Sequence, residues 1–281
     1  MPGILYIVAT PIGNLEDMTY RAVRILSEAD LIAAEDTRHS RRLLNHFGIS
    51  KPLTSYFDHN QQLKGEQLLT ALQQGKQVAL ISDAGTPCIS DPGYTLVRDA
   101  AAAGITVIPV PGACAAITAL SAGGLPSDLF TFAGFPPARQ AGRRDFLARH
   151  ARLAGTLVLY EAPHRLLDTL DDIRTVMGER QVVVARELSK IYEEFIRGTV
   201  TVVMASVEQG KARGEVVILI HAGEPDTETA ESLDNLLQRL IHGEKLSVKD
   251  AALKASLISG SSRSECYAVA IRVKNDGENQ K

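Results

Sequence analysis

Charged side chains gather where a short apolar run ends at residue 34. Glu35 and Asp36 are followed by the cations Arg38, Arg41 and Arg42. Guanidinium groups bind phosphates through paired hydrogen bonds, and a nearby carboxylate can orient a ligand or accept a proton. The alternative is a solvated charge run that pairs with itself and caps a helix. Both interpretations stay open at this point.

Two later loops combine glycine, proline and small residues. Residues 83–93 follow an apolar run and include Asp83, Thr86 and Ile89, and residues 109–116 read Pro-Val-Pro-Gly-Ala-Cys-Ala-Ala. Loops of this kind expose backbone donors and acceptors, and small residues let a flat ligand approach closely. We expect a binding site here. Residues 10–15 have neither of the glycine spacings of a dinucleotide or nucleoside triphosphate loop, which disfavours those ligands.

In the second half of the chain, two apolar runs are also followed by polar residues. Residues 160–165 read Tyr-Glu-Ala-Pro-His-Arg, and residues 186–194 begin Arg-Glu-Leu-Ser-Lys. An extended segment would direct Arg186, Leu188 and Lys190 to one side. Arg186, Glu187 and Lys190 are therefore better candidates for function than His164, because a histidine beside a proline is more often an exposed helix cap.

The elements that must position these loops alternate along the first half. Runs rich in β-branched residues at 4–9, 31–34, 78–82 and 107–110 predict strands, and helical spacing at 19–29, 65–74, 93–103 and 113–122 predicts helices between them. Strands that are apolar on both faces indicate a mostly parallel sheet covered by helices. In an open sheet of this kind, ligands bind beyond the carboxyl ends of the strands.

The remainder of the chain predicts a different organisation. Gly and Pro punctuation at residues 123–128 favours a domain boundary, and strands are expected at 129–132, 156–160, 182–186, 200–204 and 216–221. Short connections between the last three predict antiparallel hairpins and a mixed sheet. We therefore expect an α/β protein with an N-terminal domain over residues 1–124, a second domain over 125–223 and a small helical C-terminal segment over 224–281.

Composition narrows the class of protein. The 281 residues are 45% hydrophobic and 22% charged, with 30 Lys and Arg against 33 Asp and Glu, so a folded protein is expected and any nucleic-acid site must be a local patch. Three dispersed cysteines without a paired spacing predict no metal site and a reduced, cytoplasmic protein. We expect neither export nor a membrane span, because no apolar run is long enough.

Taken together, six motifs resemble a known family. They are residues 9–15, 35–38, 82–87, 109–112, 160–165 and 186–190, in that order along the chain. The chain resembles the ribosomal RNA small subunit methyltransferase I branch of the tetrapyrrole (class III) methylase superfamily. The resemblance implies two α/β domains of the tetrapyrrole methylase type and S-adenosylmethionine in the cleft between them. It also implies a homodimer that methylates a cytidine ribose 2′-hydroxyl in the decoding region of small-subunit rRNA, within the assembled subunit.

The resemblance also implies positions for the cofactor contacts. In this sequence they fall on Pro11, Thr86, Ile89, Cys114, Ala115, Tyr160 and Leu188. Thr86 occupies a position where tetrapyrrole methylases carry an aspartate, so Asp83 is the expected source of that carboxylate contact.

Transfer of a methyl group to a ribose hydroxyl requires alignment and a group that accepts the proton or stabilises the developing oxyanion. Glu161 and Asp36 are candidate acceptors, and Arg186 and Lys190 are candidate stabilisers. Arginines expected to bind RNA phosphates are listed here: Arg38, Arg41, Arg42, Arg139, Arg143 and Arg144. Two alternatives remain: a small-molecule tetrapyrrole or corrinoid methylase, and a non-catalytic RNA-binding protein on a methylase scaffold.

Overall fold

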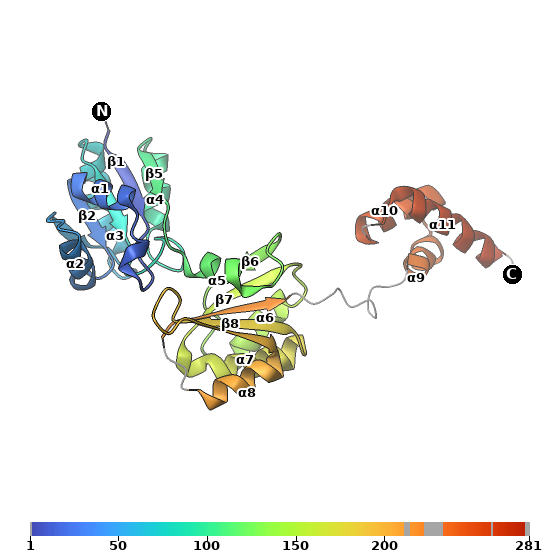
Figure 1. The fold of residues 1–281 in the computed structure, drawn as a ribbon. Helices are drawn as coiled ribbons and strands as arrows, with labels where there is room; N and C mark the ends of the chain where they lie inside the picture. The colour runs from blue at the N-terminus through green and yellow to red at the C-terminus, as the bar shows by residue number, and fades with distance from the viewer. Residues whose placement is uncertain (1, 211–213, 222–232, 260, 279–281) are drawn as a thin grey trace. The chain divides into compact units, whose positions relative to one another are not determined.

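The computed structural model describes residues 2–210, 214–221, 233–259 and 261–278. The chain divides into two compact units, Met1–Ala222 and Gly223–Lys281 (Figure 1). The boundary that we expected at residue 223 lies outside the described residues, and each unit is considered by itself.

The first sheet is parallel throughout. Its strands are β1 (Ile4–Val8), β2 (Leu31–Ala34), β3 (Leu53–Ser55), β4 (Val78–Ile81) and β5 (Thr106–Val110). They lie in the order β3-β2-β4-β1-β5, and each neighbouring pair is parallel. The chain leaves β1 toward β2 but leaves β4 toward β5, so the adjacent carboxyl ends of β1 and β4 form the crevice where ligands of such sheets bind.

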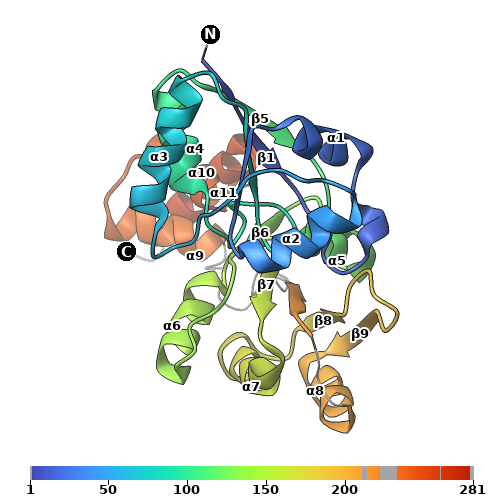
Figure 2. The ribbon, with the colours of Figure 1, turned by 90° about the vertical axis from the view of Figure 1, so that its left-hand side faces the viewer.

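Alternate residues of these strands enter two separate cores. Leu5, Ala33 and Leu80 pack on one face, while Val8 and Ile81 pack on the other. This two-residue period explains why the runs are apolar on both faces. Figure 2 shows α1 (Tyr20–Glu28) and α2 (Thr37–His46) on one side of the strands, and α3 (Gln61–Gln73) and α4 (Tyr94–Ala102) on the other.

The second sheet is mixed, as predicted. Its strands are β6 (Phe130–Phe132), β7 (Thr156–Glu161), β8 (Gln181–Arg186), β9 (Glu194–Thr199) and β10 (Val216–His221). The order is β6-β7-β10-β8-β9, with β6 and β7 parallel and the other pairs antiparallel. The ends of β6, β7 and β8 and the beginning of β10 therefore share one edge.

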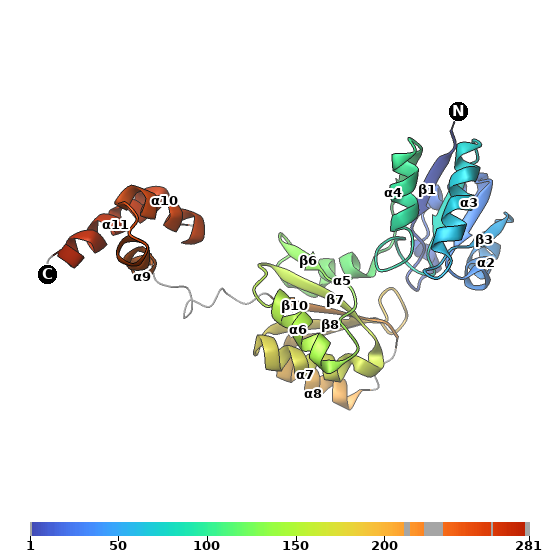
Figure 3. The same ribbon diagram turned by 180° about the vertical axis from the view of Figure 1, so that it is seen from behind.

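Helices cover one face of this sheet (Figure 3). They are α6 (Gln140–His150), α7 (Leu166–Met177) and α8 (Val200–Gln209). Elsewhere, short 3-10 turns follow β1 at Leu15–Asp17 and β7 at Pro163–Arg165. The prediction of a strand at 200–204 was wrong. Val200, Val203 and Val207 are buried at helical spacing, and the strand is the preceding segment β9. A run of β-branched residues alone did not distinguish the two.

Helix α5 (Ala115–Gly123) covers the other face of the second sheet. Its residues Ala116, Ala119 and Leu120 share a core with Val158 and Leu219 of β7 and β10. The boundary that we expected after residue 124 is therefore misplaced. In packing terms the first sheet ends with β5, and the junction precedes α5.

The C-terminal unit is helical, as expected. It contains α9 (Leu233–Gln238), a π-helical turn over Arg239–Gly243, α10 (Val248–Ser259) and α11 (Arg263–Glu278). Leu237, Leu240, Ala255, Cys266 and Ala270 form a core of their own.

A buried ion pair joins α6 to α7. Asp172 is fully buried, and its carboxylate accepts hydrogen bonds from Nε of Arg143 and Nε of Arg144, both at 2.6 Å. Arg143 is also buried, whereas the Arg144 side chain is 39% exposed. Removing the carboxylate would leave a guanidinium buried without its countercharge, which is strongly unfavourable.

We predict that Asp172→Ala lowers the free energy of unfolding by ~3–5 kcal/mol. The matched control is Asp171→Ala, because Asp171 pairs with Arg174 at 2.6 Å while both side chains are exposed. The control should cost at most ~1 kcal/mol. Urea denaturation followed by circular dichroism measures both changes, and equal losses would contradict the role of the buried pair.

Candidate functional site

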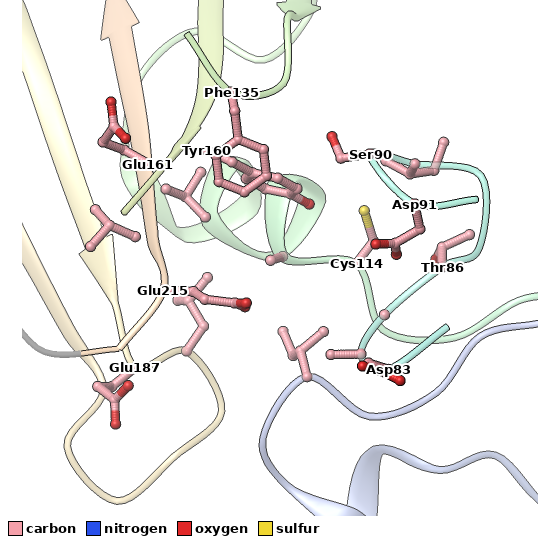
Figure 4. A pocket seen from close by; sticks show the side chains of 18 of the residues that line it. Asp83, Thr86, Ser90, Asp91, Cys114, Phe135, Tyr160, Glu161, Glu187 and Glu215 are labelled. Carbon is pink, nitrogen blue, oxygen red and sulfur yellow. The ribbon is translucent and has the colours of Figure 1, made fainter. Parts of the chain in front are cut away.

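A pocket of about 250 Å³ lies between the crevice of the first sheet and the shared edge of the second (Figure 4). Residues from both halves of the first unit line it. They are Ile12, Glu35, Asp83, Ala84, Gly85, Thr86, Ile89, Ser90, Asp91, Cys114, Ala115, Phe135, Tyr160, Glu161, Glu187, Leu188, Lys190, Glu215, Val216 and Val217.

The loops after β1 and β4 are joined at the crevice. The backbone N–H of Thr10 donates to the carbonyl of Gly85 at 2.8 Å, and Gly85 returns the bond to Thr10 at 3.1 Å. Gly85 has φ +81°, and an added Cβ would lie 3.3 Å from the side chain of Ile12. Only glycine adopts this conformation at little cost in so tight a space. The two hydrogen bonds between Thr10 and Gly85 hold together the loops that form the first-sheet side of the pocket.

The loop over residues 83–93 is strained. Cys88 and Ser90 have φ values of +71° and +65°, a region that costs non-glycine residues about 1–3 kcal/mol each. The Thr86 hydroxyl donates to the carbonyl of Ala113 at 3.0 Å, which ties this loop to the segment before α5. Strain of this kind persists where the surrounding structure enforces it, and it often marks functional sites.

Aromatic residues form the wall at the second sheet. The Tyr160 ring makes edge contacts with Phe132 and Phe135, with centroids 4.9 and 5.5 Å away. Its hydroxyl oxygen accepts a hydrogen bond from the backbone N–H of Ala116 at 3.2 Å. Burial raises the pKa of Tyr160, so the hydroxyl stays protonated at neutral pH.

The loop after β8 meets the loop after β1. Glu187 and Ser189 have φ values of +52° and +62°, and the backbone N–H of Asn14 donates to the Ser189 hydroxyl at 3.1 Å. A Cβ on Gly13 would lie 2.6 Å from Lys190, so the two loops touch. Nζ of Lys190 donates to the Glu187 carboxylate at 2.9 Å. This contact closes a second side of the pocket.

The pocket is acidic. Glu35, Asp83, Asp91, Glu187 and Glu215 all line it, and Lys190 is the one cation in the lining as far as the chain is described. Burial raises the pKa of Glu35, and the negative charge of Asp83 raises it further. Burial, followed by the charge of Glu35, raises the pKa of Asp91 to about 7. These carboxylates favour a positively charged ligand and repel phosphates.

Most residues expected to contact a cofactor face this pocket. Those in the lining are Asp83, Thr86, Ile89, Cys114, Ala115, Tyr160 and Leu188. Pro11 is not in the lining; it is buried directly before Ile12, which is. Chain topology thus brings together residues from four separate motifs.

The expected catalytic residues are dispersed. Lys190 lines the pocket, whereas Arg186 is outside the lining and pairs with Glu194. Asp36 caps α2 by accepting a hydrogen bond from the backbone N–H of Arg38 at 2.7 Å. That bond lowers the pKa of Asp36. The capping interpretation of this charge run therefore describes its local structure.

The Glu161 carboxylate is held by hydrogen bonds within the second half of the first unit. Its carboxylate accepts hydrogen bonds from the Thr169 hydroxyl at 2.6 Å, from the backbone N–H of Ala162 at 2.7 Å and from Nη2 of Arg165 at 3.2 Å. The side chain has no exposed surface, and in Figure 4 it points away from Asp91 and Cys114. These bonds occupy the lone pairs that a proton acceptor needs.

The expected RNA-binding arginines divide into two groups. Arg38, Arg41 and Arg42 are exposed on α2, and Arg139 is exposed where α6 begins. The prediction that Arg143 binds RNA was wrong, because its guanidinium is buried against Asp172 and is not available to a phosphate. Arg144 shares that carboxylate and keeps part of its side chain exposed.

Several residues that line the pocket were not among the expected site residues, including Glu35, Asp91, Phe135 and Glu215. Glu35 and Asp91 lay in loops already singled out, and Phe135 follows the end of β6, where the rule for carboxyl ends applies. Glu215 directly precedes β10, whose neighbours are antiparallel to it, so the rule that ligands bind at the carboxyl ends of parallel strands does not predict this residue. Among the described residues, no three His, Cys, Asp or Glu side chains form a group that could hold a metal ion, and no helix is both long and apolar enough to cross a membrane.

The first unit thus combines a parallel sheet, a mixed sheet and an acidic pocket between them. Residues 4–203 match the family of tetrapyrrole (corrin/porphyrin) methylases, and the chain belongs to this family. The structure is similar to that of the methyltransferase CobJ, with a TM-score of 0.57 and 19% identity, covering 78% of this chain and 94% of that one.

Closer relatives identify the branch. The chain is 50% identical over 274 residues to ribosomal RNA small subunit methyltransferase I of Escherichia coli O157:H7, covering 96% of this chain and 95% of the relative. It is 49% identical over 276 residues to the protein of that name from Pseudomonas aeruginosa, covering 96% and 97%. Within the family, the chain belongs to the ribosomal RNA small subunit methyltransferase I branch.

The raised pKa of Asp91 predicts a pH dependence of stability. The unfolded chain ionises this carboxyl near pH ~4, and the folded chain does so at about 7. Between these values the folded state holds a proton that the unfolded state has released, so the free energy of unfolding falls as pH rises. Above about pH 7 both states are ionised and this contribution is constant.

We therefore expect Asp91→Asn to lose less stability than the parent between pH ~4.5 and ~7.5. Denaturant midpoints at the two pH values measure the difference. Asp145→Asn, at an exposed position of α6, is the control and should follow the parent. An identical pH dependence in all three proteins would contradict the burial of Asp91.

Proposed function

We propose that this protein transfers a methyl group from S-adenosylmethionine to small-subunit rRNA, at the 2′-hydroxyl of a cytidine ribose. The observation that carries the proposal is the acidic pocket at the crevice between the two sheets. The names of the close relatives, each a ribosomal RNA small subunit methyltransferase I, supply the substrate class.

The pocket suits S-adenosylmethionine in its charge and in the kinds of surface that it offers. Its sulfonium and ammonium groups are cations, which the carboxylates of Asp83, Asp91 and Glu215 favour. Apolar side chains of Ile12 and Leu188 offer surface to the adenine ring. Exposed backbone groups of the loops over residues 83–93 and 111–115 offer hydrogen bonds to its polar atoms.

The reaction replaces one bond with another. When bound, S-adenosylmethionine would supply an electrophilic methyl group, which would pass from sulfur, leaving its bonding electron pair there, to the ribose oxygen, while the hydroxyl proton would pass to solvent. Lys190 lines the pocket, and its ammonium group, which donates to the Glu187 carboxylate at 2.9 Å, can stabilise the negative charge that develops on the oxygen. Arg186 and Asp36 stand outside the lining, and the Glu161 carboxylate is already hydrogen-bonded, so Lys190 is the catalytic residue that we favour.

RNA would be held by cations outside the pocket. Helix α2 carries Arg38, Arg41 and Arg42 and begins two residues after Glu35, which lines the pocket. Arg139 lies four residues after Phe135, another lining residue. Exposed arginines of this kind contact phosphates and position a strand without reading its sequence. The substrate that we propose is rRNA within the assembled small subunit.

We further propose that the enzyme is a cytoplasmic homodimer. The loop after β8 presents Ile191 and Tyr192 with 94% and 80% of their surfaces exposed. Neighbouring apolar side chains this exposed favour a protein partner, and a second copy would cover them. Cys88, Cys114 and Cys266 form no disulfide, and thiols of this kind persist in a reducing compartment. Sedimentation equilibrium of the full chain measures the dimer.

Filling the pocket should abolish cofactor binding. Ala115 lines the pocket at the start of α5, and we predict that Ala115→Trp weakens S-adenosylmethionine binding by at least ~100-fold, because the indole would occupy the ligand's space. The control is Ala102→Trp, at an exposed position of α4. Calorimetry measures both. Unchanged affinity in folded Ala115→Trp would contradict the site, and a parent that binds no cofactor would favour the non-catalytic RNA-binding alternative.

The substrate is tested in a strain that lacks this protein. Mass mapping of its small-subunit rRNA should show the loss of one 2′-O-methyl mark, and the parental chain should restore it. In single-turnover assays Lys190→Ala should methylate at least ~100-fold more slowly while binding S-adenosylmethionine, and Arg186→Ala should remain close to the parent. An intact rRNA mark in the deletion strain would instead favour the small-molecule tetrapyrrole methylase alternative.

A further inference from the structure

Phe135 combines exposure with a fixed backbone. It belongs to the pocket lining, yet 52% of its surface is open to solvent. The carbonyl of Gly134 accepts a hydrogen bond from the backbone N–H of Tyr160 at 3.0 Å, and the carbonyl of Pro136 accepts one from Nη2 of Arg165 at 2.6 Å. Gly134 is therefore tied to β7 and Pro136 to the 3-10 turn that follows it, and the proline fixes one backbone angle.

The ring is oriented by another aromatic ring. Phe135 and Tyr160 meet edge to face, with centroids 5.5 Å apart and planes inclined by 61°. Tyr160 is itself held by Phe132 and by the backbone of Ala116. Figure 4 shows the two rings side by side at one end of the pocket, across from Cys114 and Asp91. A single exposed phenylalanine needs no special explanation, but this one is held rigidly at the opening of a ligand site.

Among the described lining residues, Phe135 and Tyr160 are the aromatic ones. The Tyr160 hydroxyl is occupied by α5, and its ring is flanked by two others. Phe135 is the more exposed ring and stands at the rim, where a nucleotide would enter. Proteins that recognise single-stranded RNA stack splayed bases on exposed aromatic rings of this kind.

We infer that Phe135 is the platform on which the base of the target nucleotide stacks, so that its ribose is presented to the pocket. The inference rests on the proposed rRNA substrate. Sequence-specific recognition of RNA mostly targets single-stranded nucleotides whose bases are splayed out of the stack, and a rigid ring beside the pocket compensates such a base for the lost stacking. Arg139, exposed four residues further along the chain, is the cation that we expect to contact the adjoining phosphate.

The test compares Phe135→Leu with a matched control. Leucine keeps apolar volume but removes the aromatic face. Phe130→Leu alters a phenylalanine of β6 that is 39% exposed and outside the lining. Fluorescence anisotropy measures affinity for small-subunit rRNA, free and in assembled subunits, and calorimetry measures affinity for S-adenosylmethionine. We expect Phe135→Leu to weaken RNA binding ~10–100-fold, as loss of one stacked base does, with cofactor affinity within ~2-fold of the parent.

Further variants decide the cause. Phe135→Tyr should keep RNA affinity within ~3-fold of the parent, because it restores a ring, and Phe130→Leu should equal the parent. A fall in S-adenosylmethionine affinity in Phe135→Leu would assign the ring to the cofactor and overturn the inference. Parental RNA affinity in Phe135→Leu would overturn it as well, while leaving the proposed function in place. A parental chain that neither binds nor methylates the RNA would overturn the proposed function itself.

Discussion

The packing of α5 is the constraint on which the site depends. The helix follows the last strand of the first sheet, yet its small apolar face, Ala116 and Ala119, is buried against the second sheet. Its first turn contributes Cys114 and Ala115 to the pocket, and the carbonyl of Ala113 holds Thr86 of the opposite loop. One short helix thus belongs to both halves of the enzyme and fixes the distance between them.

Charge gives the pocket its selectivity. Glu35, Asp83, Asp91, Glu187 and Glu215 contribute carboxylates to a small space, and burial together with mutual repulsion keeps Asp91 partly protonated near neutral pH. A ligand that brings positive charge relieves this repulsion, whereas one that brings phosphates would increase it. The exposed arginines have the opposite preference and lie outside the lining. The molecule therefore separates its region for a cation from its region for a polyanion.

The sequence predicted the parallel sheet because strands buried on both faces leave a continuous apolar run. It also directed attention to the loops over residues 83–93 and 109–116, because they follow strands and are rich in glycine, proline and small residues, and residues of both loops line the pocket. It did not predict α8, since the β-branched run at Val200 satisfies both a strand and a helix until its burial is known. Nor did it distinguish Arg143 from Arg144. Which arginine turns inward depends on Asp172, a partner on another helix.

Catalytic roles were the hardest to predict for the same reason. Glu161 and Asp36 have the right chemistry at strand ends, but a carboxylate's availability depends on which donors reach it in three dimensions. Thr169 and Arg165 reach Glu161, and the first turn of α2 reaches Asp36. Topological rules identify the edge of a sheet; they do not identify which side chains at that edge are already hydrogen-bonded.

The segment that carries Phe135 is anchored through its backbone carbonyls, while its side chain contributes little to the core. Selection can therefore exchange the residue at this position with a small cost in stability. The loops over residues 83–93 and 187–190 have less freedom, because their backbone is strained at several non-glycine residues and packs closely against its neighbours. Inheritance of an unchanged donor site alongside a variable rim is a route by which one ancestral methylase could give rise to lineages acting on unrelated acceptors, from corrins to nucleic acids.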